Sequence, residues 1–182
     1  KPDEAKAHYN LGVLLKALDR LDEAEASFMQ AISLNPNYVE AHYNLGTLIM
    51  EIGRHQEAEA SLMKVISLNP NYAEAYGNLG NTLKELGRLD EAEKSYKQLI
   101  ALKPDYPEGH YNLGNTLREL DRLDEAETSL MQAIVLQPDH AEAHYNLGTI
   151  IIKTGRHQEA LDKLLTGGGV ISFDLNNGLT IL

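Results

Sequence analysis

The sequence of 182 residues contains no cysteine, few basic side chains and no long apolar run. Without cysteine the chain has no disulfide framework and no thiolate metal site. Lysine and arginine number 16 against 27 aspartates and glutamates, so the formal net charge is −11. This charge opposes binding to nucleic acid phosphates and anionic membrane surfaces. No apolar run approaches the roughly 20 residues that a membrane-spanning helix needs. We therefore expect no nucleic-acid partner, no membrane insertion and a cytoplasmic location.

The chain does contain an internal repeat. The pentapeptide HYNLG at residues 8–12 returns three times at multiples of 34 residues, and the related YGNLG fills the remaining place at 76–80. A period of this length indicates an array of stacked supersecondary units. The repeats run over residues 5–38, 39–72, 73–106, 107–140 and 141–165, and residues 166–182 follow without repeating. The first residue of each repeat is called position 1 from here on.

Each repeat carries two helical patterns. Apolar residues at positions 3, 7, 11 and 14 form one face of a first helix, and positions 20, 24, 27, 28 and 30 do so for a second. Glycine or aspartate at position 15 ends the first helix, and proline at position 32 prevents the second from continuing. Glycine at position 8 and alanine at position 20 allow close approach of helices. One such pair cannot bury its apolar stripe alone, so the pairs must stack.

The pattern of Leu at position 7, Gly at 8, Ala at 20, an aromatic residue or Leu at 24, Ala at 27 and Pro at 32 resembles the tetratricopeptide repeat (TPR) family over residues 1–165. It departs from the family where His or Tyr replaces Trp at position 4, and where Val65 and Leu99 replace Ala at position 27. The resemblance implies an all-α, right-handed superhelical solenoid of five antiparallel helix pairs. It also implies that the first helices line a concave groove that binds proteins or peptides.

A row of asparagines at position 6 lies beside the apolar stripe of the first helices. Positions 2, 6, 9 and 13 share one sector of a helix, which reads Glu, Asn, Asn, Glu in the third and fourth repeats. An asparagine amide both donates and accepts, which matches the backbone of an extended peptide, and the glutamates favour a basic partner. The predicted peptide-binding residues are Asn10, Asn44, Asn78, Asn112, Asn146, Asn81, Asn115, Tyr43, Tyr111, Glu74, Glu85 and Glu108.

Two plainer interpretations stay open at this point. Each asparagine could bond a backbone carbonyl of the adjacent repeat and serve packing alone, and the glutamates could be a solvated face. The histidines at position 4 suggest a metal site, but helices about 8–10 Å apart cannot share one zinc at roughly 2 Å per ligand. His140 and His144 have a suitable spacing but no third ligand. The arginines at position 16 are interpreted as solvated turn residues whose exposed ion pairs contribute little. We expect no metal, no cofactor and no catalytic site.

The C-terminal segment departs from the repeat. Three glycines at 167–169 oppose a sixth helix, while Val170–Leu175 and Leu179–Leu182 are β-prone and flank an Asn-Asn-Gly turn. This hairpin could cover the last repeat, pair with another copy to give a homo-oligomer through residues 167–182, or begin a further domain. At the other end, Lys1-Pro2-Asp3 copies Lys103-Pro104-Asp105 and suggests an earlier repeat.

The sequence thus predicts a non-catalytic scaffold that binds an extended peptide or protein segment, with a preference for a basic one. Two alternatives remain: the substrate-recruiting arm of a larger transferase-type enzyme, and a scaffold that assembles with itself through its C-terminal tail.

Overall fold

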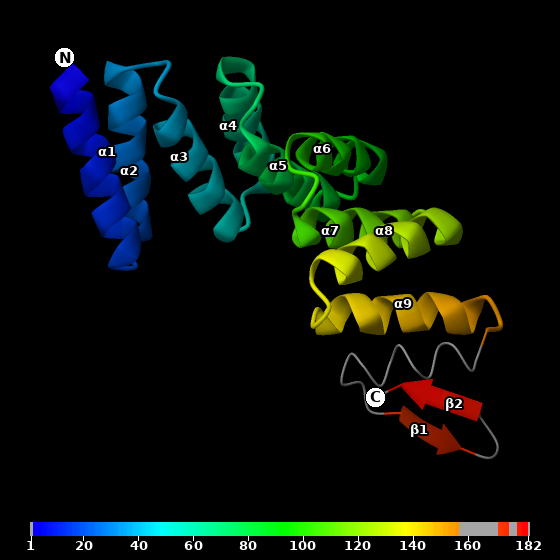
Figure 1. Cartoon of the computed structure of the whole chain (residues 1–182). Helices are drawn as coiled ribbons and strands as arrows, with labels where there is room; N and C mark the ends of the chain where they lie inside the picture. The colour runs from blue at the N-terminus through cyan, green and yellow to red at the C-terminus, as the bar shows by residue number, and fades with distance from the viewer. Residues whose placement is uncertain (1, 157–170, 175–177, 182) are drawn as a thin grey trace. The chain divides into compact units, whose positions relative to one another are not determined.

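The computed structural model describes residues 2–156, 171–174 and 178–181. The chain divides into two compact units, unit 1 of residues 1–102 and unit 2 of residues 103–182. Within the described residues both units contain helix hairpins, in which a turn of three or four residues joins two helices (Figure 1). The expected fold class, an all-α stack of antiparallel helix pairs with a short β-prone tail, is confirmed.

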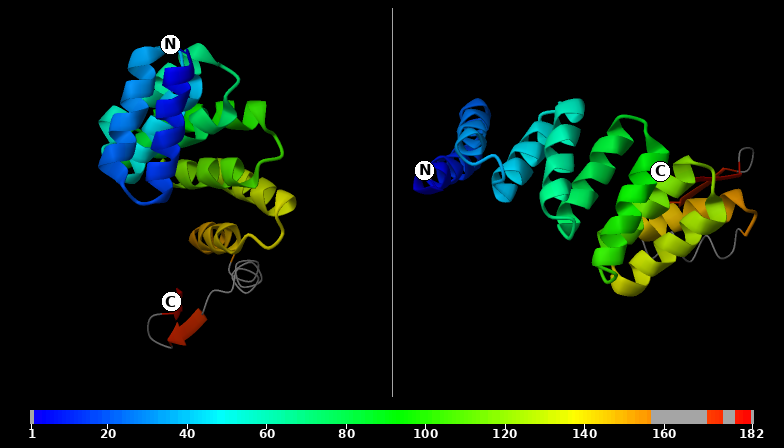
Figure 2. Two further views of the ribbon diagram at one scale, coloured as in Figure 1. Left: turned by 90° about the vertical axis from the view of Figure 1, so that its left-hand side faces the viewer. Right: turned by 90° about the horizontal axis from the view of Figure 1, so that it is seen from above.

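Unit 1 is a row of three helix hairpins. Its helices are α1 (Pro2–Ala17), α2 (Leu21–Leu34), α3 (Val39–Glu51), α4 (His55–Leu68), α5 (Ala73–Glu85) and α6 (Leu89–Leu102). The two helices of each hairpin pack on each other, and α2 and α4 also pack on the first helix of the next hairpin. The turned views in Figure 2 show these helices following one another in chain order, from blue to green. Stacking in this way buries the apolar stripes that a single hairpin leaves exposed.

Unit 2 combines helices with a short β-hairpin. Its described helices are α7 (Pro107–Glu119), α8 (Leu123–Leu136) and α9 (Ala141–Lys153), and its strands are β1 (Ile171–Asp174) and β2 (Gly178–Ile181). The strands are antiparallel, with Ile171 opposite Ile181, and they fall where the sequence predicts the two arms of a hairpin. The predicted second helix of the fifth repeat, the glycine run at 167–169 and residues 175–177 of the turn lie outside the described residues.

Helix α1 begins earlier in its repeat than the other first helices. Helices α3, α5, α7 and α9 begin at position 1, whereas α1 also includes Pro2, Asp3 and Glu4. Proline is well tolerated in a first turn, and acidic side chains there interact favourably with the positive end of the helix. Pro2 and Asp3 are therefore helical, although their sequence copies a loop between repeats.

A residue with positive φ follows each first helix. Gly53, Gly87 and Gly155 have φ of 81°, 72° and 81°, and Asp19 and Asp121 have φ of 58°. Glycine adopts this left-handed conformation readily, while a side chain makes it costly. The helix ends thus lie where the glycine and aspartate at position 15 predict them.

The residue at position 24 fills the space between the two helices of a hairpin. Phe28, Leu62, Tyr96 and Leu130 hold this place, and none has exposed surface. The glycine at position 8 faces them: a Cβ added to Gly12 would lie 2.7 Å from the Phe28 ring. Glycine in mid-helix costs about 1 kcal/mol relative to alanine. The close approach of the bulky residue at position 24 is the packing reason for accepting that cost.

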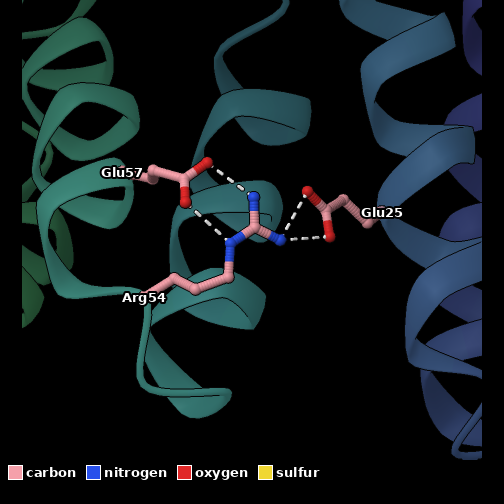
Figure 3. A network of polar contacts seen from close by, with 3 residues as sticks. All are labelled: Glu25, Arg54 and Glu57. Atoms are coloured by element: carbon pink, nitrogen blue, oxygen red, sulfur yellow. Dashed lines mark hydrogen bonds and ion pairs between the residues drawn. The ribbon is translucent and has the colours of Figure 1, made fainter.

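The arginines at position 16 join neighbouring repeats. In Figure 3, Arg54 lies between Glu57 of its own repeat and Glu25 of the preceding one. Its Nε and Nη2 donate to Glu57 at 2.8 and 2.5 Å, and its Nη1 donates to the two oxygens of Glu25 at 2.9 and 2.7 Å. Arg88 contacts Glu91 and Glu59 in the same way in the next repeat. Arg54 and Arg88 lie in turns with partly exposed side chains, as the sequence predicts, but each also bridges two repeats, which the sequence did not predict.

We expect acid to weaken the ion pairs that Arg54 and Arg88 make within their own repeats. The hydrogen bond from Arg54 lowers the pKa of the Glu57 carboxyl below its usual 4.5, and Arg88 lowers the pKa of Glu91 in the same way. A carboxyl whose pKa is lower in the folded state adds stability above its unfolded pKa, and this stability is lost as the pH falls through the folded pKa. The free energy of unfolding in urea should therefore decrease below pH 4.5.

The matched variant is the double substitution Arg54→Met and Arg88→Met, which removes both bridging cations. Its unfolding free energy should fall less steeply than that of the wild type as the pH decreases below 4.5. Equal slopes for the two proteins would mean that other carboxyls set the acid sensitivity.

Candidate peptide-binding face

Three of the five asparagines at position 6 donate a hydrogen bond to a tyrosine of the preceding repeat. In unit 1, Asn44 on α3 donates from Nδ2 to the Tyr9 hydroxyl on α1 at 2.9 Å. Asn78 on α5 donates in the same way to Tyr43 on α3 at 3.1 Å. Asn10 on α1 is exposed. The three first helices of unit 1 are therefore connected through one side of each helix, which we call the asparagine face.

Unit 2 repeats this contact once. Asn146 on α9 donates to the Tyr111 hydroxyl at 3.3 Å and to Oδ1 of Asn115 at 2.8 Å, both on α7. Asn146 keeps only 9% of its surface exposed. Asn112 is half-buried, and the residue 35 positions before it is Gly77, where the other three asparagines have a tyrosine. Within the described residues the Asn112 amide has no hydrogen bond.

These contacts bear on the two interpretations of the asparagines, which are peptide binding and packing between repeats. The hypothesis that each asparagine bonds a backbone carbonyl of the adjacent repeat is wrong for Asn44, Asn78 and Asn146, because their partners are side chains. An amide offers two N–H donors and an acceptor oxygen. Asn44 and Asn78 each use one donor, and their Oδ1 atoms have no hydrogen bond within the described part of the chain. The amides therefore connect the repeats and retain a free acceptor.

The tyrosines are held in place by a second ring. The ring of Tyr43 lies 4.9 Å from that of Tyr72, measured between centroids, and Tyr9 lies 5.1 Å from Tyr38. In unit 2, His140 takes the place of the second tyrosine, 4.6 Å from Tyr111. A tyrosine fixed by a ring on one side and an asparagine on the other has little freedom left to lose on binding.

Two of the predicted binding residues, Asn81 and Asn115, accept hydrogen bonds from buried side chains. Asn81 accepts a hydrogen bond at 2.7 Å from the hydroxyl of Tyr96, which has no exposed surface. Asn115 is only 6% exposed, and its Oδ1 accepts the bond from Asn146. In both residues the acceptor oxygen is already used, so position 9 is less available to a ligand than position 6.

The asparagine face is acidic. Glu40, Glu74 and Glu85 of unit 1 are exposed, and so is Glu108 of unit 2. Burial raises the pKa of the Tyr72 hydroxyl, and the nearby Tyr43, Glu74 and Glu40 raise it further. Glu51, by contrast, is paired with Lys16 at 2.8 Å between α3 and α1. The middle of unit 1 therefore has exposed carboxylates close to the Tyr72 hydroxyl.

Unit 2 has a cavity of about 470 Å³ beside its asparagine face. Three predicted residues line it: Glu108, Tyr111 and Asn112. The sequence did not predict a binding role for the other lining residues, which are Gln137, Asp139, His140, Ala141 and Glu142. The acid at position 2 recurs in four of the five repeats, so Glu142 could have been found by extending the glutamate row to the fifth repeat.

The recurring histidines have a structural contact. Nε2 of His42, His110 and His144 donates to the carbonyl of the proline six residues earlier, at 3.0, 2.8 and 2.9 Å. In the described ranges, no three His, Asp or Glu side chains are grouped closely enough to hold a metal ion. Among the helices described here, none has the length and apolar character needed to cross a membrane.

Comparison with family models gives matches along most of the chain. Models of the tetratricopeptide repeat match residues 5–38, 27–60, 61–94 and 111–166, and a model of the TPR repeat matches residues 80–121. Together these matches cover residues 5–166 without a gap. No curated protein sequence matches the chain.

Solved structures with the same fold include several TPR proteins. A crystal structure of MamA has a TM-score of 0.84 at 26% identity, covering 86% of this chain and 91% of its own. A thermophilic TPR protein in Thermus thermophilus has a TM-score of 0.67 at 28% identity, covering 90% and 89%. YrrB, a TPR protein with an unusual peptide-binding site, has a TM-score of 0.78 at 23% identity, covering 88% and 82%.

Proposed function

Because the chain belongs to the tetratricopeptide repeat family, whose members generally serve as protein-interaction scaffolds, we propose that its asparagine face binds an extended peptide. The observation that carries this proposal is the hydrogen bonding of the Asn44 and Asn78 amides. Each amide is fixed by one hydrogen bond to a tyrosine, and each leaves its acceptor oxygen without a partner in the described residues. Donor groups of a peptide backbone would satisfy these oxygens.

The tyrosine contact makes the asparagines better suited to binding. A free asparagine side chain loses rotamer freedom when it binds a ligand, which reduces the affinity. Asn44 and Asn78 have already lost this freedom through their bonds to Tyr9 and Tyr43. Because the two asparagines occupy the same position in consecutive repeats, a peptide lying across α3 and α5 would meet the same polar group twice. This arrangement suits recognition of the backbone more than of particular side chains.

The acidic residues favour basic side chains in the ligand. The cavity in unit 2 lies beside Asn112 and carries the carboxylates of Glu108, Asp139 and Glu142. Its volume of about 470 Å³ falls within the range of small ligand pockets and is sufficient for a lysine or arginine side chain. A basic side chain that enters this cavity would gain charge complementarity, whereas an acidic one would be repelled.

The test begins with a peptide selected on the wild-type chain from a phage-displayed library of random linear peptides. We expect the selected sequences to be enriched in lysine and arginine. Calorimetry should then show the double variant Asn44→Ala, Asn78→Ala binding the chosen peptide roughly tenfold to a hundredfold more weakly. Two lost hydrogen bonds at about 0.5–1.5 kcal/mol each give this range.

Two controls separate binding from packing. The double variant Tyr9→Phe, Tyr43→Phe loses the same two inter-repeat bonds but keeps both amides, so its affinity should fall through lost pre-organisation, but by less than that of the Asn44 and Asn78 variant. The double variant Asn37→Ala, Asn71→Ala removes two amides from the turns and should bind like the wild type. If the tyrosine variant weakens as much as the Asn44 and Asn78 variant, the asparagines serve packing alone and the proposal is wrong.

A further inference from the structure

Unit 2 reverses a charge contact that joins neighbouring repeats in unit 1. In unit 1, Lys16 at position 12 of the first repeat donates from Nζ to Glu51 at position 13 of the second repeat, at 2.8 Å. The residues at these two positions in the fourth and fifth repeats are Arg118 and Lys153. A place that holds a cation and an anion between α1 and α3 therefore holds two cations between α7 and α9.

The guanidinium of Arg118 has no partner within the described residues. Its Nε is buried, and none of its three nitrogens makes a hydrogen bond to any residue of that part of the chain. Lys153 contacts Asp121 instead, from Nζ to Oδ1 at 2.7 Å, and both of these side chains are mostly exposed. A buried donor without an acceptor lowers stability and is rare in folded proteins. Arg118 therefore lacks the carboxylate that Lys16 has.

A cavity of about 190 Å³ lies beside these two cations in unit 2. It is lined by Arg118, Leu123, Thr149, Ile150 and Lys153, so both of its charged lining residues are positive. Apolar walls around charges of one sign strengthen their field inside a cavity. A water molecule takes up about 30 Å³ in the liquid, so the cavity has room for a carboxylate or a phosphate group.

We propose that this cavity is an oxyanion site, in which a carboxylate or phosphate group of a ligand bridges Arg118 and Lys153. The guanidinium would donate two parallel N–H groups to the ligand, and the ammonium of Lys153 would supply the second positive charge. The ligand would thus provide the anion that Glu51 provides to Lys16 in unit 1. The oxyanion site differs from the asparagine face of unit 1 and does not depend on the proposed peptide binding.

The negative net charge of the chain limits the affinity of the oxyanion site but does not prevent binding. The formal net charge of −11 repels an approaching anion. Salt screens charges that lie more than about 8 Å apart at physiological ionic strength, so the two cations beside the cavity dominate once the ligand is close. We therefore expect dissociation constants in the millimolar range for small anions, and weaker binding as the salt concentration rises.

The test is an NMR titration of the full chain, which follows the Nε–H signal of Arg118 and the backbone amide signals of Thr149 and Ile150. The two probes are inorganic phosphate and the capped tripeptide acetyl-Gly-Glu-Gly-amide, and sodium chloride at the same ionic strength is the control. We expect saturable shifts of these signals with at least one probe and only small, linear shifts with chloride. Tighter binding of the tripeptide would identify an acidic side chain as the source of the anion, and tighter binding of phosphate a phosphate group.

Lys153→Glu gives Arg118 a partner within the chain, because it places a carboxylate at position 13 as in the second repeat. It should weaken binding of the probe by about tenfold or more, while the melting temperature stays the same or rises. Lys64→Glu on α4 changes the net charge equally, outside the cavity, and should bind like the wild type. Asn44→Ala with Asn78→Ala should also leave probe binding unchanged, which separates this site from the asparagine face. No saturable shift with either probe, or equal affinity of Lys153→Glu and the wild type, would overturn the proposal.

Discussion

Gly80→Ala should lower the free energy of unfolding by about 2 kcal/mol, although alanine is the better helix former. A Cβ at residue 80 would lie 2.5 Å from Cε1 of Tyr96 and 2.8 Å from Cδ1 and Cζ. The Tyr96 ring has no exposed surface, and its hydroxyl is fixed to Asn81 at 2.7 Å, so the ring cannot move aside without breaking that bond. Overpacking of a core costs about 1–3 kcal/mol or more, and helix propensity returns only about 1 kcal/mol.

The same substitution one repeat earlier is the matched control. A Cβ on Gly46 would lie 3.1 Å from Cγ and 3.2 Å from Cδ2 of Leu62, which is a flexible aliphatic side chain. Gly46→Ala should therefore change the unfolding free energy in urea by less than about 1 kcal/mol. Adding Tyr96→Leu to Gly80→Ala should recover part of the loss. If the two glycine substitutions changed the unfolding free energy equally, the size of the residue at position 24 would not be the reason for glycine at position 8.

The fold could be predicted from the sequence because its signals are local and repeated. Glycine at position 15, proline at position 32 and the spacing of apolar residues each act within one helix, and five copies reinforce one another. The register of the helices follows from these signals: α3 and α5 begin at Val39 and Ala73, the first residues of their repeats. The start of α1 is the exception, since the same Pro-containing sequence forms a loop after α6 and a helical turn at Pro2.

The contacts of the candidate site could be predicted only in part, because they join residues about one period apart. Asn44 and Tyr9 are 35 residues apart, and Arg54 and Glu25 are 29 residues apart. Reading along one helix places asparagine and tyrosine on the same side but does not show which of them meet between helices. For the arginines, the sequence offered a usable signal: glutamate recurs at position 21 in every repeat that is followed by another arginine at position 16. Comparing position 21 of each repeat with position 16 of the next would have paired these glutamates with the arginines.

Leu48→Ala should lower the free energy of unfolding by about 3 kcal/mol, whereas Leu14→Ala should change it by less than about 0.5 kcal/mol. Both leucines stand at position 10 of their repeats, on α3 and α1. Leu48 has no exposed surface, so its truncation leaves a cavity between α3 and its neighbours, while Leu14 is 57% exposed and leaves none. Unfolding in urea, monitored by circular dichroism, measures both changes.

The difference in unfolding free energy between these two variants shows whether Leu14 on α1 is exposed to solvent in the free chain. If Leu14→Ala cost as much as Leu48→Ala, Leu14 would be covered in solution, and sedimentation at several concentrations would show the second copy that covers it. A small cost for Leu14→Ala would show that this face of α1 is exposed to solvent in this chain, as its 57% exposure indicates.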